Sequence, residues 1–378
     1  MRLLFVTGDL GHGGAERQTI TLANRLAERG HDCHLAYIKP ADGQRERLSF
    51  APSSLDAKKY LDLAALRSLS SLISSINPTH VVAANEYAML YARLATWGRG
   101  VPLAATFHAT VLQTMKERLK MLYYRPLFWS ADWLVFVCEA QRRYWKRRRL
   151  TGRRTEVIYN GIDTGHWRLE EGARAIMRRA LGFAEGDLVV ALPAVLRPEK
   201  NPVQLVEAVA LARRRGVAAR ALFIGDGPMR PAIEARAREL GIGAETVITG
   251  LQQDVRPLLA AADVAVLCSH SEALSLAALE ALALGRPVVH AEVGGAAEMI
   301  EPGRNGYLFA PGDTPALVER LTQLADPALR RRMAAPARAT VELRFSERAM
   351  VERYETGLEE LTIARRKREN HRRPAGAH

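Results

Sequence analysis

Two glutamates, Glu272 and Glu280, stand seven residues apart in the segment 269–290 and have the types and spacing to do chemistry. The residues from Leu276 to Leu284 are strong helix formers, so we expect Glu272 in the loop that enters a helix and Glu280 about two turns inside it. An acid in that loop lies close to a helix N-terminus, which favours an anion, and a buried acid further along can bind hydroxyl groups. The pattern fits a sugar attached to a phosphate, but it also fits an ordinary amphipathic helix with a solvated glutamate at each end.

A second candidate site is a loop with two cations three residues apart, Arg197 and Lys200, directly after the apolar run 188–194. Arg offers bidentate hydrogen bonds and Lys offers a mobile point charge, so the two side chains could converge on one diphosphate. The alternative is a pair of solvated loop cations.

The first apolar run is followed by a glycine-rich segment that includes Gly13 and Gly14 and opens a helix-like stretch. Glycines allow the backbone to approach a ligand closely, although neither a dinucleotide-binding fingerprint nor a P-loop is present, and a plain tight turn remains open. His108 ends the fourth apolar run, where a ligand crevice would lie, but a lone histidine is more often structural. Gly225 belongs to a Gly-Asp-Gly-Pro turn that we interpret as mostly structural.

The elements that must position these residues alternate between apolar strands and helix-like stretches in two series, which is typical of parallel doubly wound sheets. In such sheets ligands bind beyond the carboxyl ends of the strands, so two domains of this kind would form a site in the cleft between them. We expect α/β architecture with two Rossmann-like domains facing across a cleft, residues 1–165 and 166–345, with a helix at about 346–368 packing back on the first domain and a disordered basic tail at 369–378. The predicted strands are 3–7, 33–38, 80–84, 102–107, 133–137, 155–159, 188–194, 220–224, 246–249, 264–268, 287–291 and 306–309.

Taken in order, these segments resemble the retaining glycosyltransferases of family 4, which have the GT-B fold. The resemblance spans nearly the whole chain, from Gly13 to about residue 345, and its specific part is the glutamate pair together with the Arg/Lys loop. One departure is Ala273, which stands where the family often has Gly. The further matching pieces are His108, Asn160-Gly161-Ile162-Asp163, Gly225-Asp226-Gly227-Pro228 and Gly294-Gly295 with Glu298.

The resemblance implies a role for each matching residue. Arg197 and Lys200 would hold the donor diphosphate, Glu280 would bind the ribose, and Glu272 would bind the donor sugar. From the other domain, His108 would help to place the sugar and the acceptor. Gly13 and Gly14 would allow the first helix to approach the donor, with Gly14 also at the acceptor. The donor-binding set is completed by Ala273, Leu274, Ser275, Leu276 and Gly225.

The chemistry implied is transfer of a hexose-type sugar from a nucleoside-diphosphate sugar to a glycolipid or oligosaccharide, with retention of configuration and front-face attack. A nucleoside diphosphate is already a good leaving group, so the enzyme mainly stabilises its charge. We expect no metal and no cofactor, because no Asp-x-Asp stands at a strand end and no His/Cys cluster has ligand spacing. A UDP-sugar is weakly favoured over GDP-mannose as the donor.

The charge balance of 54 Lys and Arg against 41 Asp and Glu, a net +13, suggests an anionic partner. Two segments, Met115–Trp129 and Arg142–Arg149, combine basic with aromatic residues and could lie on an anionic membrane, unless their aromatic faces pack inward. No recognised nucleic-acid motif is present, and three sparse cysteines indicate a reducing compartment. Because no secretory signal and no membrane-spanning run is visible, we expect a cytoplasmic protein that is peripheral on the inner membrane.

Two other functions stay open at this point. A nucleotide-sugar epimerase or hydrolase can share a two-domain α/β fold, but its elimination chemistry needs further acids and bases that the sequence does not place. A non-catalytic glycosyltransferase-like subunit would keep the fold, although loss of some of the four charged site residues would then be expected.

Overall fold

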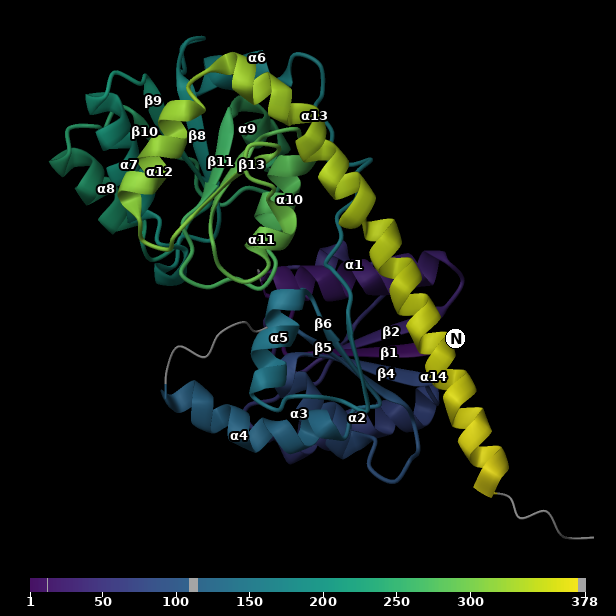
Figure 1. Cartoon of the computed structure of the whole chain (residues 1–378). Coiled ribbons are helices and arrows are strands. Elements are labelled where there is room, and N and C mark those ends of the chain that lie inside the picture. Colours follow the sequence, from purple (N-terminus) through teal and green to yellow (C-terminus); the bar gives the residue numbers. More distant parts are fainter. Residues whose placement is uncertain (12, 109–114, 373–378) are drawn as a thin grey trace, which may run out of the picture. The chain divides into compact units, whose positions relative to one another are not determined.

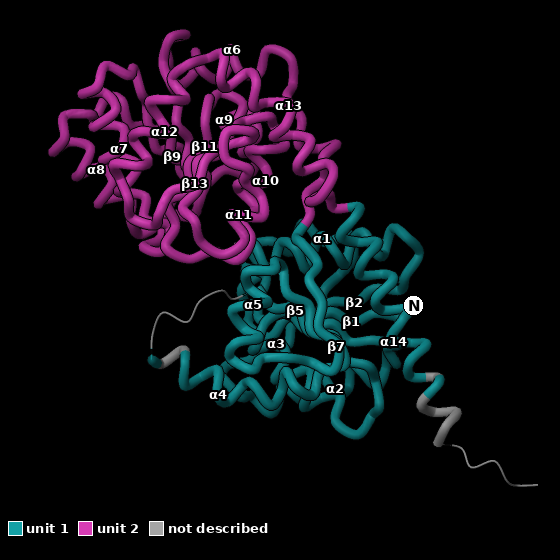
Figure 2. Tube along the Cα trace, in the orientation of Figure 1, with its two compact units in different colours: residues 1–160, 348–378 teal, residues 161–347 magenta. Residues whose placement is uncertain are grey.

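The computed structural model describes residues 1–11, 13–108 and 115–372 and divides into two compact units (Figure 2). Unit 1 contains residues 1–160 and the C-terminal segment from Arg348, and unit 2 contains Gly161–Glu347. The two segments that link the units pair with each other, because the Ile162 N–H donates to the Phe345 carbonyl over 3.0 Å and the Glu347 N–H donates to the Ile162 carbonyl over 2.9 Å. The division therefore falls at residues 160/161 rather than at the predicted 165/166.

Unit 1 is built on a seven-stranded parallel sheet in the order β3-β2-β1-β4-β5-β6-β7 (Figure 1). From β1 the chain proceeds to β2 on one side, whereas β4 pairs on the other side, so the order reverses between β1 and β4. The strands are β1 (Arg2–Thr7), β2 (Asp32–Tyr37), β3 (Ser53–Ser54), β4 (His80–Ala84), β5 (Leu103–Phe107), β6 (Trp133–Phe136) and β7 (Arg154–Val157).

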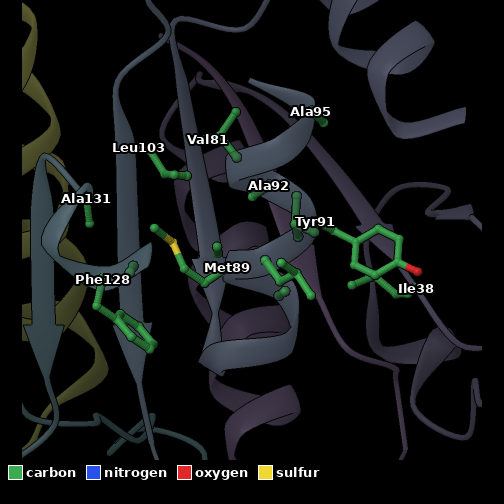
Figure 3. Close-up of a cluster of buried hydrophobic side chains, with 14 of the residues drawn as sticks. Ile38, Val81, Met89, Tyr91, Ala92, Ala95, Leu103, Phe128 and Ala131 are labelled. Atoms are coloured by element: carbon green, nitrogen blue, oxygen red, sulfur yellow. The ribbon is translucent and has the colours of Figure 1, made fainter. Parts of the chain in front are cut away.

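Helices cover this sheet and bury its apolar residues in clusters, one of which is drawn in Figure 3. In that cluster Met89 and Tyr91 lie on a helix that packs against strands β4 and β5, and Phe128 comes from the helix that precedes β6. Every residue of β4 and of β5 is buried, as expected for a parallel sheet covered on both faces. The helical elements of unit 1 are α1 (Gly14–Glu28), η1 (Arg45–Arg47), α2 (Leu63–Ile76), α3 (Asn85–Ala95), α4 (Met115–Trp129), α5 (Glu139–Arg147) and α14 (Glu347–Arg372).

The C-terminal helix α14 packs on unit 1. Its Glu355 carboxylate lies 2.7 Å from Nε2 of His31 and 2.6 Å from a guanidinium nitrogen of Arg29. Further along, the Thr362 hydroxyl lies 3.1 Å from Nε2 of the buried His80, whose pKa is lowered to about 4 by burial, so the imidazole is neutral at pH 7. The helix runs to Arg372, so the prediction that 369–378 is disordered is wrong for 369–372, and residues 373–378 lie outside the described part of the chain.

Unit 2 contains a six-stranded parallel sheet in the order β10-β9-β8-β11-β12-β13, which reverses between β8 and β11. The strands are β8 (Leu188–Pro193), β9 (Ala219–Ile224), β10 (Thr246–Ile248), β11 (Val264–Leu267), β12 (Val288–Ala291) and β13 (Gly306–Phe309). The helical elements are α6 (Ala173–Ala180), η2 (Pro198–Lys200), α7 (Val203–Arg214), α8 (Arg230–Glu239), α9 (Arg256–Ala261), α10 (Leu276–Ala283), α11 (Ala296–Met299), α12 (Thr314–Gln323) and α13 (Pro327–Arg344).

All the predicted strands are present, and the two sheets have the predicted parallel doubly wound topology. Two further features differ from the sequence analysis. The two-residue strand β3 was not predicted, because two residues are too few for a period-2 pattern to appear. The stretch 160–186, interpreted as a connection, contains helix α6, whose arginines bind within unit 2.

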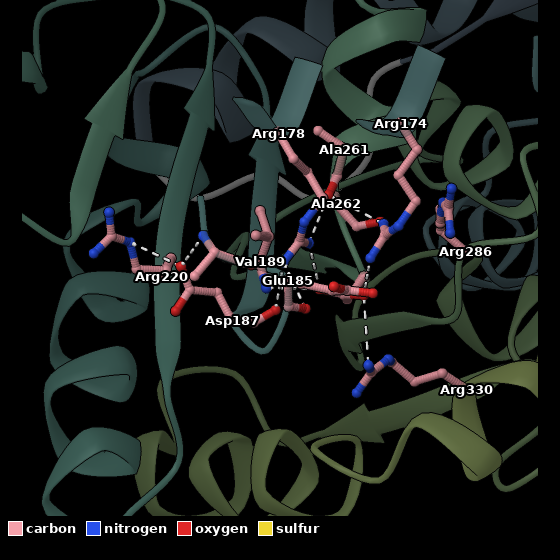
Figure 4. A network of polar contacts seen from close by, with 12 residues as sticks. Arg174, Arg178, Glu185, Asp187, Val189, Arg220, Ala261, Ala262, Arg286 and Arg330 are labelled. Carbon is pink, nitrogen blue, oxygen red and sulfur yellow. Dashed lines mark hydrogen bonds and ion pairs between the residues drawn. The ribbon is translucent and has the colours of Figure 1, made fainter. Parts of the chain in front are cut away.

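A buried carboxylate, Asp263, organises the edge of the unit 2 sheet from which β11 starts. Its arginine partners Arg174, Arg178 and Arg330 are labelled in Figure 4. Its side chain is 4% exposed and accepts from the Val189 N–H over 2.8 Å, which ties β11 to β8. Its oxygens lie 2.6 Å from Arg174, 3.1 Å from Arg178 and 3.5 Å from Arg330. The same guanidinium groups also donate to backbone carbonyls near the ends of helices α9 and α12, so one carboxylate and several carbonyl oxygens together hold three cations.

Candidate functional site

The carboxyl edge of the unit 2 sheet carries the predicted cations and acids at the point where the strand order reverses. Lys200 ends the 3₁₀ helix η2, which follows β8, and Glu272 follows β11. These two strands are neighbours in the sheet. Ligands of open α/β sheets bind at this kind of switch point, because loops from adjacent strands diverge there and leave a crevice.

Lys200 and Glu272 are in contact. The Lys200 ammonium donates to Oε1 of Glu272, and the Ser269 hydroxyl donates to the same oxygen over 2.9 Å. The side chains are 25% and 13% exposed, so the pair is largely shielded yet reachable from solvent. A backbone hydrogen bond of 2.8 Å from His270 to the Glu199 carbonyl fixes the two loops together, so the position of the pair is set by main chain as well as by charge.

Arg197 lies outside this contact. It precedes η2, its side chain is 55% exposed, and its nearest carboxylate partner is Glu199 at 3.9 Å. A long, exposed guanidinium beside a shielded Lys/Glu pair has the reach and the charge to bind a phosphate that enters from solvent.

Helix α10 begins at Leu276, after the loop that carries Glu272, and contains the second glutamate. Its N-cap residue, Ser275, accepts a hydrogen bond of 3.3 Å from the Ala278 N–H. The other N–H groups of the first turn, which starts at Leu276, have no acceptor within the helix. Glu280 is the fifth residue of the helix and is 4% exposed, so it lies about one turn inside rather than the predicted two. The helix begins at Leu276 as predicted, and only four residues separate its start from Glu280, which is little more than one turn.

The loop that carries Glu272 is held by a glycine. Gly294 has a φ of +54°, and a Cβ there would collide with the carbonyl groups of Glu272 and Ala273. The next residue, Gly295, donates its N–H to the Ala273 carbonyl over 2.7 Å. Ala273 has no positive φ, so Ala is accommodated where the family often has Gly. Its neighbour Leu274 is buried.

We expect Gly294→Ala to lower kcat/KM by about tenfold or more, because a Cβ would push the Glu272 loop out of place and small misplacements of reacting groups are costly. Gly303→Ala is the matched control, since Gly303 also has a positive φ, +80°, but has open space around it. Both substitutions carry the left-handed backbone penalty of about 1–2 kcal/mol. Equal kinetics in the two variants would show that the Gly294 contact does not position Glu272.

Gly225 holds the neighbouring loop. Its φ is +141°, and a Cβ there would collide with the Ala194 carbonyl, so the turn after β9 lies against the chain leaving β8. Gly225 therefore allows the backbone of the turn after β9 to pack closely against the loop that leads to Arg197.

Two of the remaining predicted site residues, Gly13 and Gly14, open helix α1 in unit 1. Gly13 is the N-cap with an extended φ of −120°, which any residue can adopt, and the flexible Glu16 carboxylate lies where its Cβ would be. The neighbouring His12 lies outside the described residues.

His108, also in unit 1, follows β5. Its backbone N–H donates to Oδ1 of Asn85 over 2.9 Å, and Asn85 itself adopts a left-handed φ of +68° at the start of α3. The imidazole is half-buried, and desolvation lowers its pKa to about 4, so it is neutral at pH 7. A neutral imidazole can both donate and accept a hydrogen bond, which suits binding to hydroxyl groups.

The sequence analysis missed two residues on the unit 2 side, Ser269 and His290. Ser269 is identified only by its contact with Glu272. His290 lies in β12 beside Leu267 of β11, is fully buried, and has Nδ1 2.7 Å from the Ala291 carbonyl. Burial lowers the pKa of His290, and its Nε2 has no hydrogen-bond partner among the described residues. The signal was available, because His290 is a histidine near a strand end just before a Gly-Gly pair.

Within the described residues, no group of three or more His, Cys, Asp or Glu side chains is arranged as a metal site. In the same part of the chain, no helix combines the length and the apolar character needed to cross a membrane.

Two family models together match most of the chain. Residues 173–340 match the family described as glycosyl transferases group 1, and residues 12–166 match glycosyltransferase family 4. The boundary between the matches falls close to the division between the two units.

Individual relatives agree with the family models. EpsD of Bacillus subtilis, a glycosyltransferase by name, is 32% identical over 304 residues, covering 77% of this chain and 79% of that protein. The lipopolysaccharide core biosynthesis glycosyltransferase LpsE of Rhizobium meliloti is 30% identical over 351 residues, covering 90% and 94%. Among solved structures, HepE of Anabaena in complex with UDP has a TM-score of 0.84 and 22% identity, and the match covers 95% of this chain and all of HepE.

Proposed function

This chain belongs to the group 1 glycosyltransferases and has the GT-B fold, and from that premise we propose which sugar it transfers and how. It is a glycosyltransferase of polysaccharide or lipopolysaccharide biosynthesis. The proposed reaction moves a hexose-type sugar from a UDP-sugar to a lipid-linked or oligosaccharide acceptor with retention of configuration. The observation that carries the proposal is the Lys200–Glu272 contact at the switch point of unit 2, with Arg197 exposed beside it.

The donor diphosphate would bind Arg197, Lys200 and the N-terminus of α10, where two cations and unpaired N–H groups favour negative charge. Glu272 would accept hydrogen bonds from hydroxyl groups of the sugar, and Glu280 would do so for the ribose. In the reaction the bond from the anomeric carbon to the diphosphate oxygen breaks. A bond to the acceptor hydroxyl forms on the same face, and the hydroxyl proton passes to the departing phosphate oxygen.

The contact between Lys200 and Glu272 supports this division of roles. With no donor bound, the lysine charge is balanced by the glutamate, so the pair does not leave an uncompensated charge in a shielded site. An entering diphosphate brings its own negative charge to Lys200 and frees one Glu272 oxygen for the sugar. The charge of the leaving group is then stabilised by side chains already present, so the proposed mechanism needs no metal.

UDP is the proposed nucleotide. HepE, whose fold this chain shares, has been solved with UDP, with UDP and glucose, and with UDP-glucose. UDP-glucose or a related hexose donor is therefore the first to test, with GDP-mannose as the alternative.

We expect UDP, but not GDP or ADP, to raise the melting temperature in the presence of EDTA, and Glu280→Ala to remove the shift, because the buried carboxylate would no longer bind the ribose. Glu239→Ala is the control, since Glu239 is a 65% exposed glutamate of unit 2. A shift with GDP alone would replace UDP by a guanosine donor. Equal UDP shifts in both variants would remove Glu280 from the nucleotide site.

The second part of the proposal concerns the membrane. Helix α4 packs Met121, Tyr124 and Phe128 inward, each at most 3% exposed. Its outward side nevertheless carries a row of exposed apolar residues at helical spacing, Met115, Leu119, Leu122 and Tyr123, with exposed fractions of 66%, 62%, 55% and 60%. The two alternatives considered for this segment, membrane contact and inward packing, therefore apply to different sides of one helix, and we propose that the outward row contacts a membrane.

Helix α5 supports the proposed membrane contact only through its positive charge. Its Trp145 is fully buried and the Arg148 guanidinium lies 3.6 Å from the Tyr144 ring centroid, while Arg143 and Arg147 are exposed. Exposed basic residues favour an anionic surface. The proposed location is thus the cytoplasmic face of the inner membrane, where the lipid-linked acceptor would be found.

We expect the protein to sediment with vesicles containing phosphatidylglycerol and much less with phosphatidylcholine vesicles. The double variant Leu119→Ser, Leu122→Ser should lose this binding, because two apolar side chains of the outward row are removed. Leu343→Ser is the control, since Leu343 is 79% exposed but belongs to unit 2. Unchanged sedimentation of the double variant would remove α4 from the membrane contact.

A further inference from the structure

The carboxyl edge of the unit 1 sheet carries a second group of side chains that the residues discussed so far leave unused. The strand order reverses between β1 and β4, so this edge has its own switch point. Gly8 follows β1, and Tyr87 lies in α3, which follows β4. A Cβ at Gly8 would sit 3.6 Å from Cδ1 of Tyr87, so the tyrosine ring lies over the glycine.

The Tyr87 ring forms an aromatic pair with Tyr60. The ring centroids of Tyr60 and Tyr87 are 5.1 Å apart with an interplanar angle of 31°, and Tyr91 meets Tyr87 edge-on at 5.3 Å. Tyr60 is 49% exposed, whereas Tyr87 is half-buried. The loop that carries Tyr60 is fixed, because the Tyr91 hydroxyl accepts from the Asp62 N–H over 2.8 Å and donates to the Tyr60 carbonyl over 3.3 Å. Tyr60 therefore presents an exposed aromatic ring on a loop whose backbone is fixed by hydrogen bonds.

Three exposed lysines lie on the segments that leave this edge of the sheet. The Lys39 ammonium lies 5.2 Å from the centroid of the Tyr87 ring, and the Lys39 N–H donates to the Gly8 carbonyl over 2.9 Å. Lys58 leaves the same edge of the sheet, because the Ala57 N–H donates to the Ile38 carbonyl over 2.9 Å, and Lys59 follows it. None of the three pairs with a carboxylate in the described part of the chain.

The nearby acids have other partners. Asp62 caps α2 by accepting from the N–H groups of Ala64 and Ala65, and it also accepts from the Lys58 backbone N–H over 3.0 Å. Asp56 accepts from the Ser54 hydroxyl. Glu86 pairs with Lys120 at 3.0 Å. The three lysine ammonium groups therefore form no ion pair with these acids and are available to a ligand.

We propose that Lys39, Lys58 and Tyr60 form an acceptor subsite that takes a phosphorylated sugar, with the phosphate on the lysines and the apolar face of the ring on Tyr60. The inference rests on the proposed glycosyltransferase function and assigns the chemical class of its acceptor. An ammonium is a mobile partner for phosphate oxygens, and an exposed, held aromatic ring offers a sugar a surface at low cost in conformational entropy. An uncharged acceptor would leave the lysines without a partner.

The test measures binding of α-D-glucose 1-phosphate as a probe to the full-length protein saturated with UDP, by titration calorimetry, with methyl α-D-glucopyranoside as the uncharged probe. We expect glucose 1-phosphate to bind at least about tenfold more tightly than the methyl glucoside. The double variant Lys39→Ala, Lys58→Ala should abolish that difference, because two charge-assisted contacts are lost. Tyr60→Ala should weaken both probes.

Arg67→Ala, which removes an exposed cation of α2 in the same unit, should change neither affinity. Equal affinities of the two probes for the unsubstituted protein, or unchanged glucose 1-phosphate binding in the double lysine variant, would overturn the subsite. The affinity for UDP, measured on each variant, separates this failure from failure of the proposed function: intact UDP binding would leave the donor site standing, and absent UDP binding would remove both.

A competition arm identifies the source of the phosphate. If phosphatidylglycerol vesicles displace glucose 1-phosphate and phosphatidylcholine vesicles do not, the subsite binds a phosphate at a lipid surface. If neither displaces it, the subsite binds a sugar phosphate free of the membrane. Both results keep the phosphate chemistry, and the Leu119→Ser, Leu122→Ser variant should prevent the displacement without changing the affinity for glucose 1-phosphate.

Discussion

Replacing Lys200 by Ala should lower kcat at least about a hundredfold, equivalent to about 2.7 kcal/mol of activation free energy. The lysine contacts Glu272 at the switch point of unit 2, where the charge of the departing diphosphate would develop. Its removal also leaves the 13% exposed Glu272 carboxylate with the Ser269 hydroxyl as its remaining side-chain partner among those described, so an anion would repel the incoming donor. Both effects act in the same direction.

The measurement is steady-state transfer from the UDP-sugar that gives the thermal shift. Arg230→Ala is the matched control, because Arg230 is a cation of unit 2 whose partners, Asp226 and Glu234, are exposed. Lys200→Arg should recover part of the lost activity, since it keeps the charge with different geometry. Near-normal turnover of Lys200→Ala would remove Lys200 from the reaction even if UDP binds.

A double-mutant cycle separates the two effects of the lysine. Glu272→Gln keeps the shape of the side chain and removes its charge. If Lys200 acts only by neutralising Glu272, the double variant should be as active as Glu272→Gln alone. If Lys200 stabilises the leaving group, its replacement should cost nearly the same in either background.

Replacing Asp263 by Ala should destabilise unit 2 by about 3–5 kcal/mol, the cost of removing one partner from a buried ion pair. The 4% exposed carboxylate is shared by Arg174, Arg178 and Arg330, and the Arg178 side chain is itself only 8% exposed. A further cation, Arg286, has its pKa lowered to about 10 by burial and, next, by Arg174 (Figure 4). Without Asp263 the cluster would keep its positive charges and lose its only described carboxylate partner.

Urea unfolding followed by circular dichroism measures the loss. Asp254→Ala is the control, because Asp254 pairs with Arg256 on the surface, where the side chains are 45% and 26% exposed, and should cost at most about 1 kcal/mol. Asp263→Asn keeps an acceptor for the Val189 N–H, so a comparison of the Asn and Ala variants divides the loss between charge and the β8–β11 hydrogen bond. A loss from Asp263→Ala no larger than that of Asp254→Ala would show that backbone carbonyls alone suffice to hold the arginines.

The aspartates that precede β6 and β11 show what a short sequence pattern can and cannot predict about structure. The sequence places Ala-Asp before both strands, which is weak evidence for a shared plan. In the structure Asp132 accepts from the Leu103 N–H over 3.0 Å, and Asp263 accepts from the Val189 N–H over 2.8 Å. Each acid therefore ties its strand to the next strand of the sheet, and this common role follows from the parallel sheet rather than from the dipeptide.

The sequence by itself determined the strands, the order of the elements and the candidate loops, because apolar periodicity and glycine positions are local properties of the chain. Lys200 and Glu272 were assigned to one site only through a family resemblance, since 71 residues lie between them. Their contact depends on β8 and β11 being neighbours across the switch point, which the order of elements along the chain does not fix.

The tertiary structure also decided which side chains are held and which are left for a ligand. The periodicity of the sequence could not show that Arg178 forms an ion pair with Asp263 or that His290 is fully buried in a strand. Nor could it show that the segments carrying Lys39 and Lys58 leave one edge of the sheet near Tyr60. These outcomes depend on residues far apart in the chain, because the partner of a charge is set by which strands pair. Local sequence therefore fixed the elements and their candidate chemistry, and strand pairing decided which of those candidates meet.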